Sequence, residues 1–215
     1  MEIVEKKDKA IEKILLAARG EFAEKGFEGA RVDEIARKAG INKAMLYYHI
    51  GDKKALYAEV LHGVIGRVAE RVEQEIAKAG NPEEKLRTYV REFYSAIRGN
   101  PEMPRIMMRE IASGGINLPE IFFKDLLRII SIITGVIEAG TKSGVFIKTM
   151  PPLVHVMVLG GIISANNIIP LLCSRDTAPK EMREMNENAS SYIASEIERL
   201  VMRSVLADAK TGEKK

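Results

Sequence analysis

The sequence predicts an all-α protein of nine helices. Nearly every long segment repeats its apolar residues at helical spacing, and no segment sustains the alternation typical of a β-strand. Capping residues or prolines open most of these segments, and glycines close several of them. We therefore expect helices over residues 8–25, 32–39, 43–49, 53–78, 82–98, 101–113, 119–143, 152–169 and 178–208.

The composition is that of an ordinary globular protein. Of its 215 residues, 46% are hydrophobic and 29% charged, and the net charge is +3, which excludes a disordered chain or a fibrous repeat. The single cysteine, Cys173, excludes an intramolecular disulfide, and with three dispersed histidines we expect no metal and no cofactor. The first nine residues are mostly charged and do not resemble a secretory signal, so we expect a cytoplasmic protein.

The first four helices have clear start and stop signals. One apolar stripe on residues 8–25 is formed by Ile11, Ile14, Leu15, Ala18 and Phe22. Gly26 follows that helix and Gly40 follows the next one, each as a left-handed stop. Asp52 is placed to cap the helix over 53–78.

The later helices begin at prolines. Asn81 can cap the helix that Pro82 opens, with Glu84 completing a reciprocal cap, and Asn100-Pro101-Glu102 repeats the device. Three further segments open at Pro119, at Pro151-Pro152 and at Pro179. We expect 209–215 to be a disordered polar tail.

The segment 149–174 contains no Asp, Glu, Lys or Arg and is long enough to span a bilayer. His155, Asn166-Asn167 and Pro170 argue against insertion, because they would place polar groups or a helix break in hydrocarbon. We expect instead a helix buried on nearly all sides, in the core or in a subunit interface. A membrane-anchored helical protein remains the alternative.

Residues 32–50 have the pattern of a helix-turn-helix. Small and apolar residues allow the two helices to cross closely, and a glycine makes the turn. These residues are Val32, Ile35, Ala36, Ala39, Gly40, Ile41, Leu46 and Ile50. The second helix would then expose its other side, an arrangement suited to the DNA major groove. Between residues 37 and 54, five basic residues face only one acidic residue, Asp52.

The run from Ile11 to Leu56 resembles the N-terminal domain of TetR-type transcriptional regulators. The resemblance is carried by Ala17-Ala18, Phe22, Gly26-Phe27, the helix-turn-helix residues, Leu46-Tyr47-Tyr48-His49, Lys53 and Leu56. It implies a nine-helix TetR-like architecture, with a three-helix DNA-binding domain over 1–52 and a helical ligand-binding and dimerisation domain over 53–208.

The resemblance also implies roles for single residues. Those facing base edges would be Lys43, Ala44, Met45 and Tyr48, and those holding phosphates Tyr47, His49 and Lys53. Family members usually have Thr or Ser before the second helix, where this chain has Arg31, so the cap must come from elsewhere and Arg31 becomes a candidate phosphate contact.

The C-terminal part offers candidate effector and dimer residues. The candidate effector residues are Met103, Met107, Met108, Glu110, Phe122, Phe123, His155 and Asn166, although core packing explains such a cluster equally well. The resemblance places the dimer interface in the last two helices, where the candidates are Gly160, Gly161, Ser164, Ala165, Ile193, Ile197, Leu200 and Val201.

The sequence therefore predicts a ligand-responsive repressor that binds a palindromic operator in double-stranded DNA as a homodimer, with no membrane partner. An enzyme is not expected, because Glu59-x-x-His62 stands alone as a metal-ligand pair and no glycine-rich phosphate loop is present. Besides the membrane-anchored alternative, a DNA-binding dimer without an effector remains open.

Overall fold

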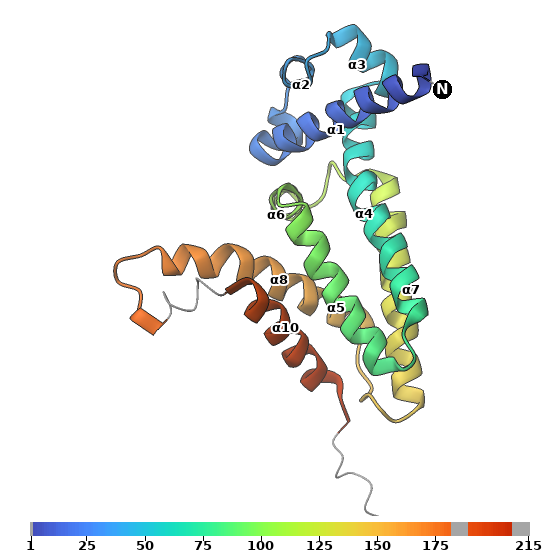
Figure 1. Ribbon diagram of the computed structural model, residues 1–215, viewed down its shortest axis with the longest axis vertical. Helices are drawn as coiled ribbons and strands as arrows, with labels where there is room; N and C mark the ends of the chain where they lie inside the picture. Colours follow the sequence, from blue (N-terminus) through green and yellow to red (C-terminus); the bar gives the residue numbers. More distant parts are fainter. Residues whose placement is uncertain (1, 182–188, 208–215) are drawn as a thin grey trace, which may run out of the picture. The chain divides into compact units, whose positions relative to one another are not determined.

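The fold was analysed in a computed structural model, which describes residues 2–181 and 189–207 (Figure 1). Over these residues the chain is helical, as predicted, and its only pairing of extended backbone is an isolated antiparallel bridge between Phe146 and Leu206. The helices are α1 (Glu2–Gly29), α2 (Val32–Ala39), α3 (Lys43–Ile50), α4 (Lys53–Lys78), α5 (Pro82–Gly99), α6 (Glu102–Ala112), α7 (Glu120–Lys142), α8 (Pro151–Cys173) and α10 (Ala189–Val205).

The chain divides into two compact units. Of the described residues, unit 1 contains those up to residue 67 together with 100–126, and unit 2 contains 68–99 and those from residue 127 onward. This division differs from the expected boundary after residue 52, because the first half of α4, all of α6 and the start of α7 belong with the helix-turn-helix. The expected tail, 209–215, lies outside the described residues.

The core of unit 1 forms around α1. Phe22 on α1 packs edge-to-face on Tyr57 of α4 with a centroid distance of 4.7 Å, and Phe27 lies 5.0 Å from the same ring. Met103 and Ile106 of α6 are buried in this cluster. Helix α6 is also held by polar contacts, because Arg109 donates to the Glu24 carbonyl at 2.9 Å and Arg19 donates to Asn100 Oδ1 at 3.0 Å.

Local signals explain several helix ends. Gly26 (φ 72°) interrupts α1, which resumes for one turn to Gly29, and Gly40 (φ 69°) ends α2 in the left-handed conformation. Asp52 caps α4 by accepting from Ala55 N at 2.8 Å, and Asn81 caps α5 by accepting from Glu84 N at 2.9 Å.

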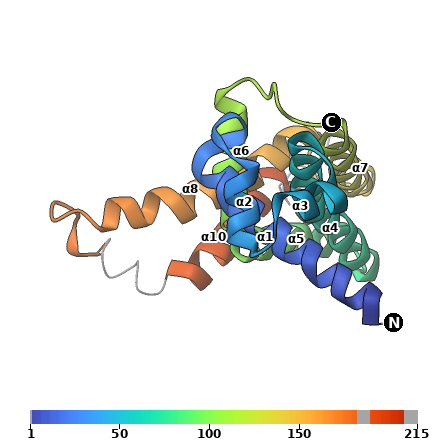
Figure 2. The same ribbon diagram turned by 90° about the horizontal axis from the view of Figure 1, so that it is seen from above.

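Unit 2 joins α5, α8 and α10. Helices α8 and α10 lie side by side in both ribbon views (Figures 1 and 2). Glu198 of α10 accepts from Arg87 Nη1 at 2.8 Å and from Arg91 Nε at 2.7 Å, which attaches α10 to α5. The side chains of Val158 and Ile162 on α8 are fully buried.

Two predicted helix ends need correction. Helix α8 continues through Pro170 to Cys173 instead of ending at residue 169. Pro170 has no backbone N–H, but it lies on an exposed side of the helix, so the helix loses a single hydrogen bond there and continues. The segment expected as one helix over 178–208 is helical at 180–181 and 189–205, and residues 182–188 lie outside the described part. Its end is also earlier than expected, since Ala207 N donates to Val145 O at 3.0 Å in the bridge.

Helix α8 is apolar but largely exposed in the single chain. It is the one described helix long and apolar enough to cross a membrane, and only 17% of its most apolar window is buried. Of the two expected places for this helix, burial in the core of one chain is therefore wrong, and burial in a subunit interface stays a prediction. Its exposed apolar residues are Leu153, Val156, Met157, Ile168, Leu171 and Leu172.

Candidate nucleic-acid interface

The turn between α2 and α3 fixes how α3 is presented. Ile35, Ala36 and Ala39 of α2 are buried, and Leu46 is the fully buried anchor of α3. Asn42 caps α3, because its side chain accepts from Met45 N at 2.7 Å. With one face of α3 anchored, its opposite face is directed to solvent.

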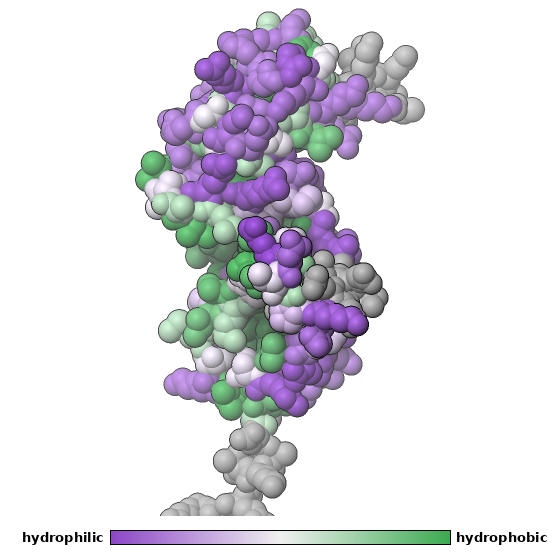
Figure 3. All heavy atoms as spheres, turned by 90° about the vertical axis from the view of Figure 1, so that its left-hand side faces the viewer, coloured by the Kyte–Doolittle hydropathy of each residue, from purple (hydrophilic) through white to green (hydrophobic). Residues whose placement is uncertain are grey.

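That outer face carries the predicted base-contacting residues. Tyr48 is 80% exposed, and Lys43, Ala44, Met45 and Tyr47 are exposed beside it. The side of the helix-turn-helix region that faces the viewer in Figure 3 is mostly hydrophilic. An eight-residue helix with one buried anchor and five outward side chains fits the width of a major groove.

Two cations of this surface are already paired within the chain. Lys43 Nζ lies 2.8 Å from Asp33 Oδ1, and the hydrogen bond to this carboxylate raises the pKa of Lys43. Arg37 forms two hydrogen bonds with Glu34, the shorter of 2.5 Å. Sequence reasoning missed Asp33, whose signal is an acidic residue in the first turn of α2, close enough to reach the start of α3.

The predicted phosphate contacts lie at the edges of this surface. Lys53 Nζ donates to the Glu28 carbonyl at 3.1 Å and sits 4.8 Å from the centre of the Phe27 ring. Arg31 is exposed at the start of α2 and its side chain makes no capping bond, as expected from the sequence. His49 is half-buried, and its Nδ1 has no hydrogen-bond partner among the described residues.

The candidate effector residues are divided between the two units. Met103 and Phe122 are buried in the core of unit 1, Met107 packs against it, and Met108 and Phe123 are exposed. Glu110 is buried, and its Oε1 accepts from the Tyr57 hydroxyl at 2.8 Å. These six residues therefore take part in, or border, the packing of unit 1.

The two remaining effector candidates belong to unit 2. Nδ1 of the buried His155 lies 2.6 Å from the Tyr89 hydroxyl oxygen. Burial lowers the pKa of His155 to about 4 and raises the pKa of Tyr89, so the phenol donates to a neutral imidazole. The Asn166 amide donates to the Ile162 carbonyl of its own helix at 2.8 Å.

The candidate dimer residues divide between the exposed surface and the core. Gly160, Ser164 and Leu200 are exposed, and Ala165 is half-buried. Ile193 and Val201 are buried within the chain, and Ile197 packs close to Gly161, with which it joins α10 to α8. Apolar side chains gather in the part of unit 2 that contains α8 and α10 (Figure 3).

Two family profiles match the sequence. One is described as bacterial regulatory proteins of the tetR family and covers residues 14–60, and the other is the C-terminal region of YsiA-like proteins and covers residues 62–167. Together they include the helix-turn-helix and most of the C-terminal part.

Curated relatives and solved structures agree with these profiles. The fatty acid metabolism regulator protein of Bacillus subtilis is 24% identical over 61% of this chain and 68% of its own length. The transcriptional repressor NicS of Pseudomonas putida is 28% identical over 65% of this chain and 66% of its own length. The matched region thus spans about two thirds of each relative.

The fold is similar to that of the regulator FadR of Bacillus subtilis, solved in complex with stearoyl-CoA. The two structures match with a TM-score of 0.64 at 20% identity, over 89% of this chain and 95% of that one. At this identity the likeness shows the fold alone.

Proposed function

Because the chain belongs to the TetR family of bacterial regulatory proteins, we propose that it is a repressor that binds a palindromic operator as a homodimer and is released by a small-molecule effector. The family and the relatives are transcriptional regulators rather than enzymes. A regulator acts where the DNA is, so we propose a cytoplasmic location. The outer face of α3 is the observation that carries this proposal.

In the proposed complex α3 lies in the major groove. Lysine can donate to guanine acceptors, and the Ala44 methyl can contact a thymine methyl, so Lys43, Ala44, Met45 and Tyr48 would read base edges. Tyr47, His49, Lys53 and Arg31 would hold the phosphates that set the register. Lys43 would exchange Asp33 for its DNA acceptor, and Lys53 would exchange the Glu28 carbonyl for phosphate.

The dimer would form through α8 and α10. The apolar stripe on α8 is exposed in one chain, and a contiguous apolar surface of this kind is typical of an interface. A second copy would cover it and place two α3 helices against successive major grooves, about 34–36 Å apart. The membrane-anchored alternative uses the same helix and is an outcome of the dimer test below.

Release would act through the helices shared by the two units. Helices α4 and α7 each begin in unit 1 and end in unit 2, so an effector that moves their C-terminal parts in unit 2 acts on the helix-turn-helix side through continuous helix. The effector shifts the equilibrium only by its different affinity for the two conformers. Acyl-CoA thioesters are the first compounds to screen, since the related FadR structure contains stearoyl-CoA.

The DNA assignment is tested by selecting bound DNA in vitro at a stated salt concentration. We expect Tyr48→Ala and Lys43→Ala each to weaken operator binding by about 1–3 kcal/mol while the dimer stays intact. Arg105→Ala, at an exposed position on α6, is the matched control and should bind as the wild type does. Unchanged operator affinity in both α3 variants would refute the assignment.

The effector is tested separately by thermal shift. A ligand at a hundredfold excess over its dissociation constant should add about 2.7 kcal/mol of stability. Uniformly negative screens with an intact operator complex would favour a DNA-binding dimer without an effector.

A further inference from the structure

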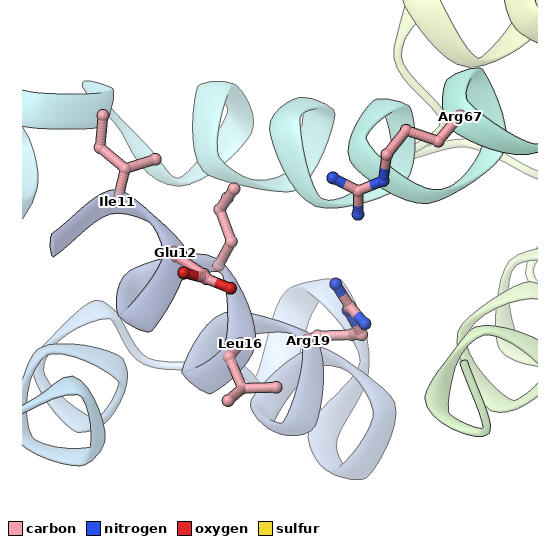
Figure 4. Close-up of a pocket in the computed structure, with 6 residues that line it drawn as sticks. Ile11, Glu12, Leu16, Arg19 and Arg67 are labelled. Atoms are coloured by element: carbon pink, nitrogen blue, oxygen red, sulfur yellow. The ribbon is translucent and has the colours of Figure 1, made fainter. Parts of the chain in front are cut away.

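Unit 1 contains a cleft between α1 and α4 that the repressor function does not use. It is open to solvent, has a volume of about 420 Å³, and lies entirely within unit 1 (Figure 4). Its lining residues are Ile11, Glu12, Leu15, Leu16, Arg19 and Arg67. Leu16 is 64% exposed although it is an apolar residue in the middle of a helix.

Two guanidinium groups border this cleft. Figure 4 shows Arg19 of α1 and Arg67 of α4 pointing toward one another. Arg19 Nη1 donates to Asn100 Oδ1 at 3.0 Å, but Arg19 Nε is buried and has no hydrogen-bond partner among the described residues. In the described part of the chain neither arginine forms an ion pair within 4.0 Å, so neither guanidinium charge is neutralised by direct contact with a carboxylate.

We propose that this cleft binds a small amphipathic anion. A single carboxylate or phosphate would lie between Arg19 and Arg67, accept from both guanidiniums and remove their repulsion. An uncharged hydrocarbon body would cover the apolar side chains of Ile11, Leu15 and Leu16. Glu12 also lines the cleft, and its carboxylate disfavours a second anionic group at the far end of the ligand's hydrocarbon body.

The ligand is a small molecule rather than the DNA backbone. Lys53 and Arg67 lie on the same continuous helix, fourteen residues apart, which corresponds to about 21 Å along its axis. The cleft is therefore far from the first turn of α4, where Lys53 would contact phosphate. A bound anion would instead tie α1 to α4, and through Arg19 it would be linked to Asn100 at the start of the α6 segment.

The test measures binding of octanoate and octyl phosphate to the full-length protein by calorimetry. We expect both to bind the wild type. Acetate, which lacks the hydrocarbon body, and octanamide, which lacks the negative charge, should each bind at least about tenfold more weakly. Arg67 is exposed, and the Arg67→Gln variant should bind octanoate at least about tenfold more weakly than the wild type does. Arg105 is an exposed arginine of the same unit outside the cleft, and the octanoate affinity of the Arg105→Gln variant should stay within about twofold of the wild-type value.

A second pair of measurements tests Glu12. The dianion octanedioate should bind the wild type more weakly than octanoate does, and Glu12→Gln should reduce that difference. Octanoate binding that survives Arg67→Gln, or that falls equally in Arg105→Gln, would overturn the proposal. Absence of octanoate and octyl phosphate binding in the wild type would overturn it as well, whereas the repressor assignment would stand on the operator measurements.

Discussion

At the scale of single residues, Glu110 is a buried acidic residue of unit 1 with one carboxyl oxygen left unpartnered among the described residues. Its Oε1 accepts from the Tyr57 hydroxyl at 2.8 Å, while Oε2 is buried and has no partner among the described residues. Burial is the main cause that raises the pKa of Tyr57, and the hydrogen bond to Glu110 adds to it. The phenol therefore stays protonated and remains a donor. The pair joins α6 to α4 inside the unit that carries the helix-turn-helix.

We predict that Tyr57→Phe lowers the free energy of unfolding by about 1.5–3 kcal/mol, because it leaves a buried carboxylate without its donor. Urea unfolding followed by circular dichroism measures the change. Tyr48→Phe makes the same chemical change at an exposed position and should leave stability within about 0.5 kcal/mol of the wild type. Equal stability of the two variants would show that the Tyr57 hydrogen bond contributes nothing.

His155 gives a prediction about pH. Its pKa in the folded chain is lowered by burial to about 4, against an ordinary 6.5, so between these values the unfolded chain binds a proton that the folded chain does not. This contribution to stability is complete above pH 6.5 and is lost at about 1 kcal/mol per pH unit as the pH falls toward 4. His155→Gln keeps an acceptor for Tyr89 but does not titrate, so unfolding of this variant should depend less steeply on pH over that range. Parallel pH profiles would contradict the prediction.

At the scale of elements, most helices could be predicted because their signals are local. Gly40 ends α2, and Asn42, Asp52 and Asn81 each cap the helix that follows. The errors arise where tertiary structure decides. Nothing near Leu206 indicates that this residue pairs with Phe146, sixty residues earlier, and ends α10 there. Pro170 is a helix breaker by local rules, yet α8 continues past it.

The attachment of α10 to α5 depends on one carboxylate. Burial acts to raise the pKa of Glu198, but hydrogen bonds from Arg91 and Arg87 more than offset it, so the pKa lies below its usual 4.5. A lowered carboxyl pKa means that its stabilisation is present above pH 4.5 and is lost as the pH falls through the folded-state value.

We therefore predict that Glu198→Gln destabilises the protein by about 1–2 kcal/mol at pH 7, a range reduced because both arginines are partly exposed. The difference from the wild type should shrink when unfolding is measured below pH 4.5. Glu196→Gln is the matched control, since Glu196 lies on the same helix and its ion pair within the described part of the chain is with the exposed Arg199, one turn away. A difference that is constant with pH would contradict this account of the attachment.

At the scale of the whole molecule, the two candidate sites differ in how far sequence could predict them. The α3 surface is formed by one short segment, so the spacing that buries Leu46 also determines that Lys43 and Tyr48 face outward. The effector candidates have only their residue types in common, and residue type does not separate core from pocket. Met103 and Phe122 pack in the core of unit 1, while His155 forms a hydrogen bond in the core of unit 2.

In the proposed dimer, the exposed apolar stripe of α8 forms the interface. Val156 is 61% exposed on the apolar stripe of this helix, and a second copy would bury it. A glutamate there would lose its hydration on association without gaining a partner. We therefore predict that Val156→Glu shifts the protein from dimer to monomer and weakens operator binding more than tenfold, because one α3 helix then binds without its two-fold mate.

Light scattering coupled to size-exclusion chromatography measures this change, and circular dichroism confirms that the variant is folded. Leu127→Glu is the control. Leu127 is a residue of unit 2 that is 67% exposed and lies on α7, outside α8 and α10. A glutamate there should leave the protein dimeric. A Val156→Glu protein that is still dimeric would exclude this face as the interface. The length and composition of α8 suit a lipid bilayer as well as a second copy of the chain. Partition of the wild type into lipid vesicles in place of dimer formation would therefore show that the same residues serve as a membrane anchor.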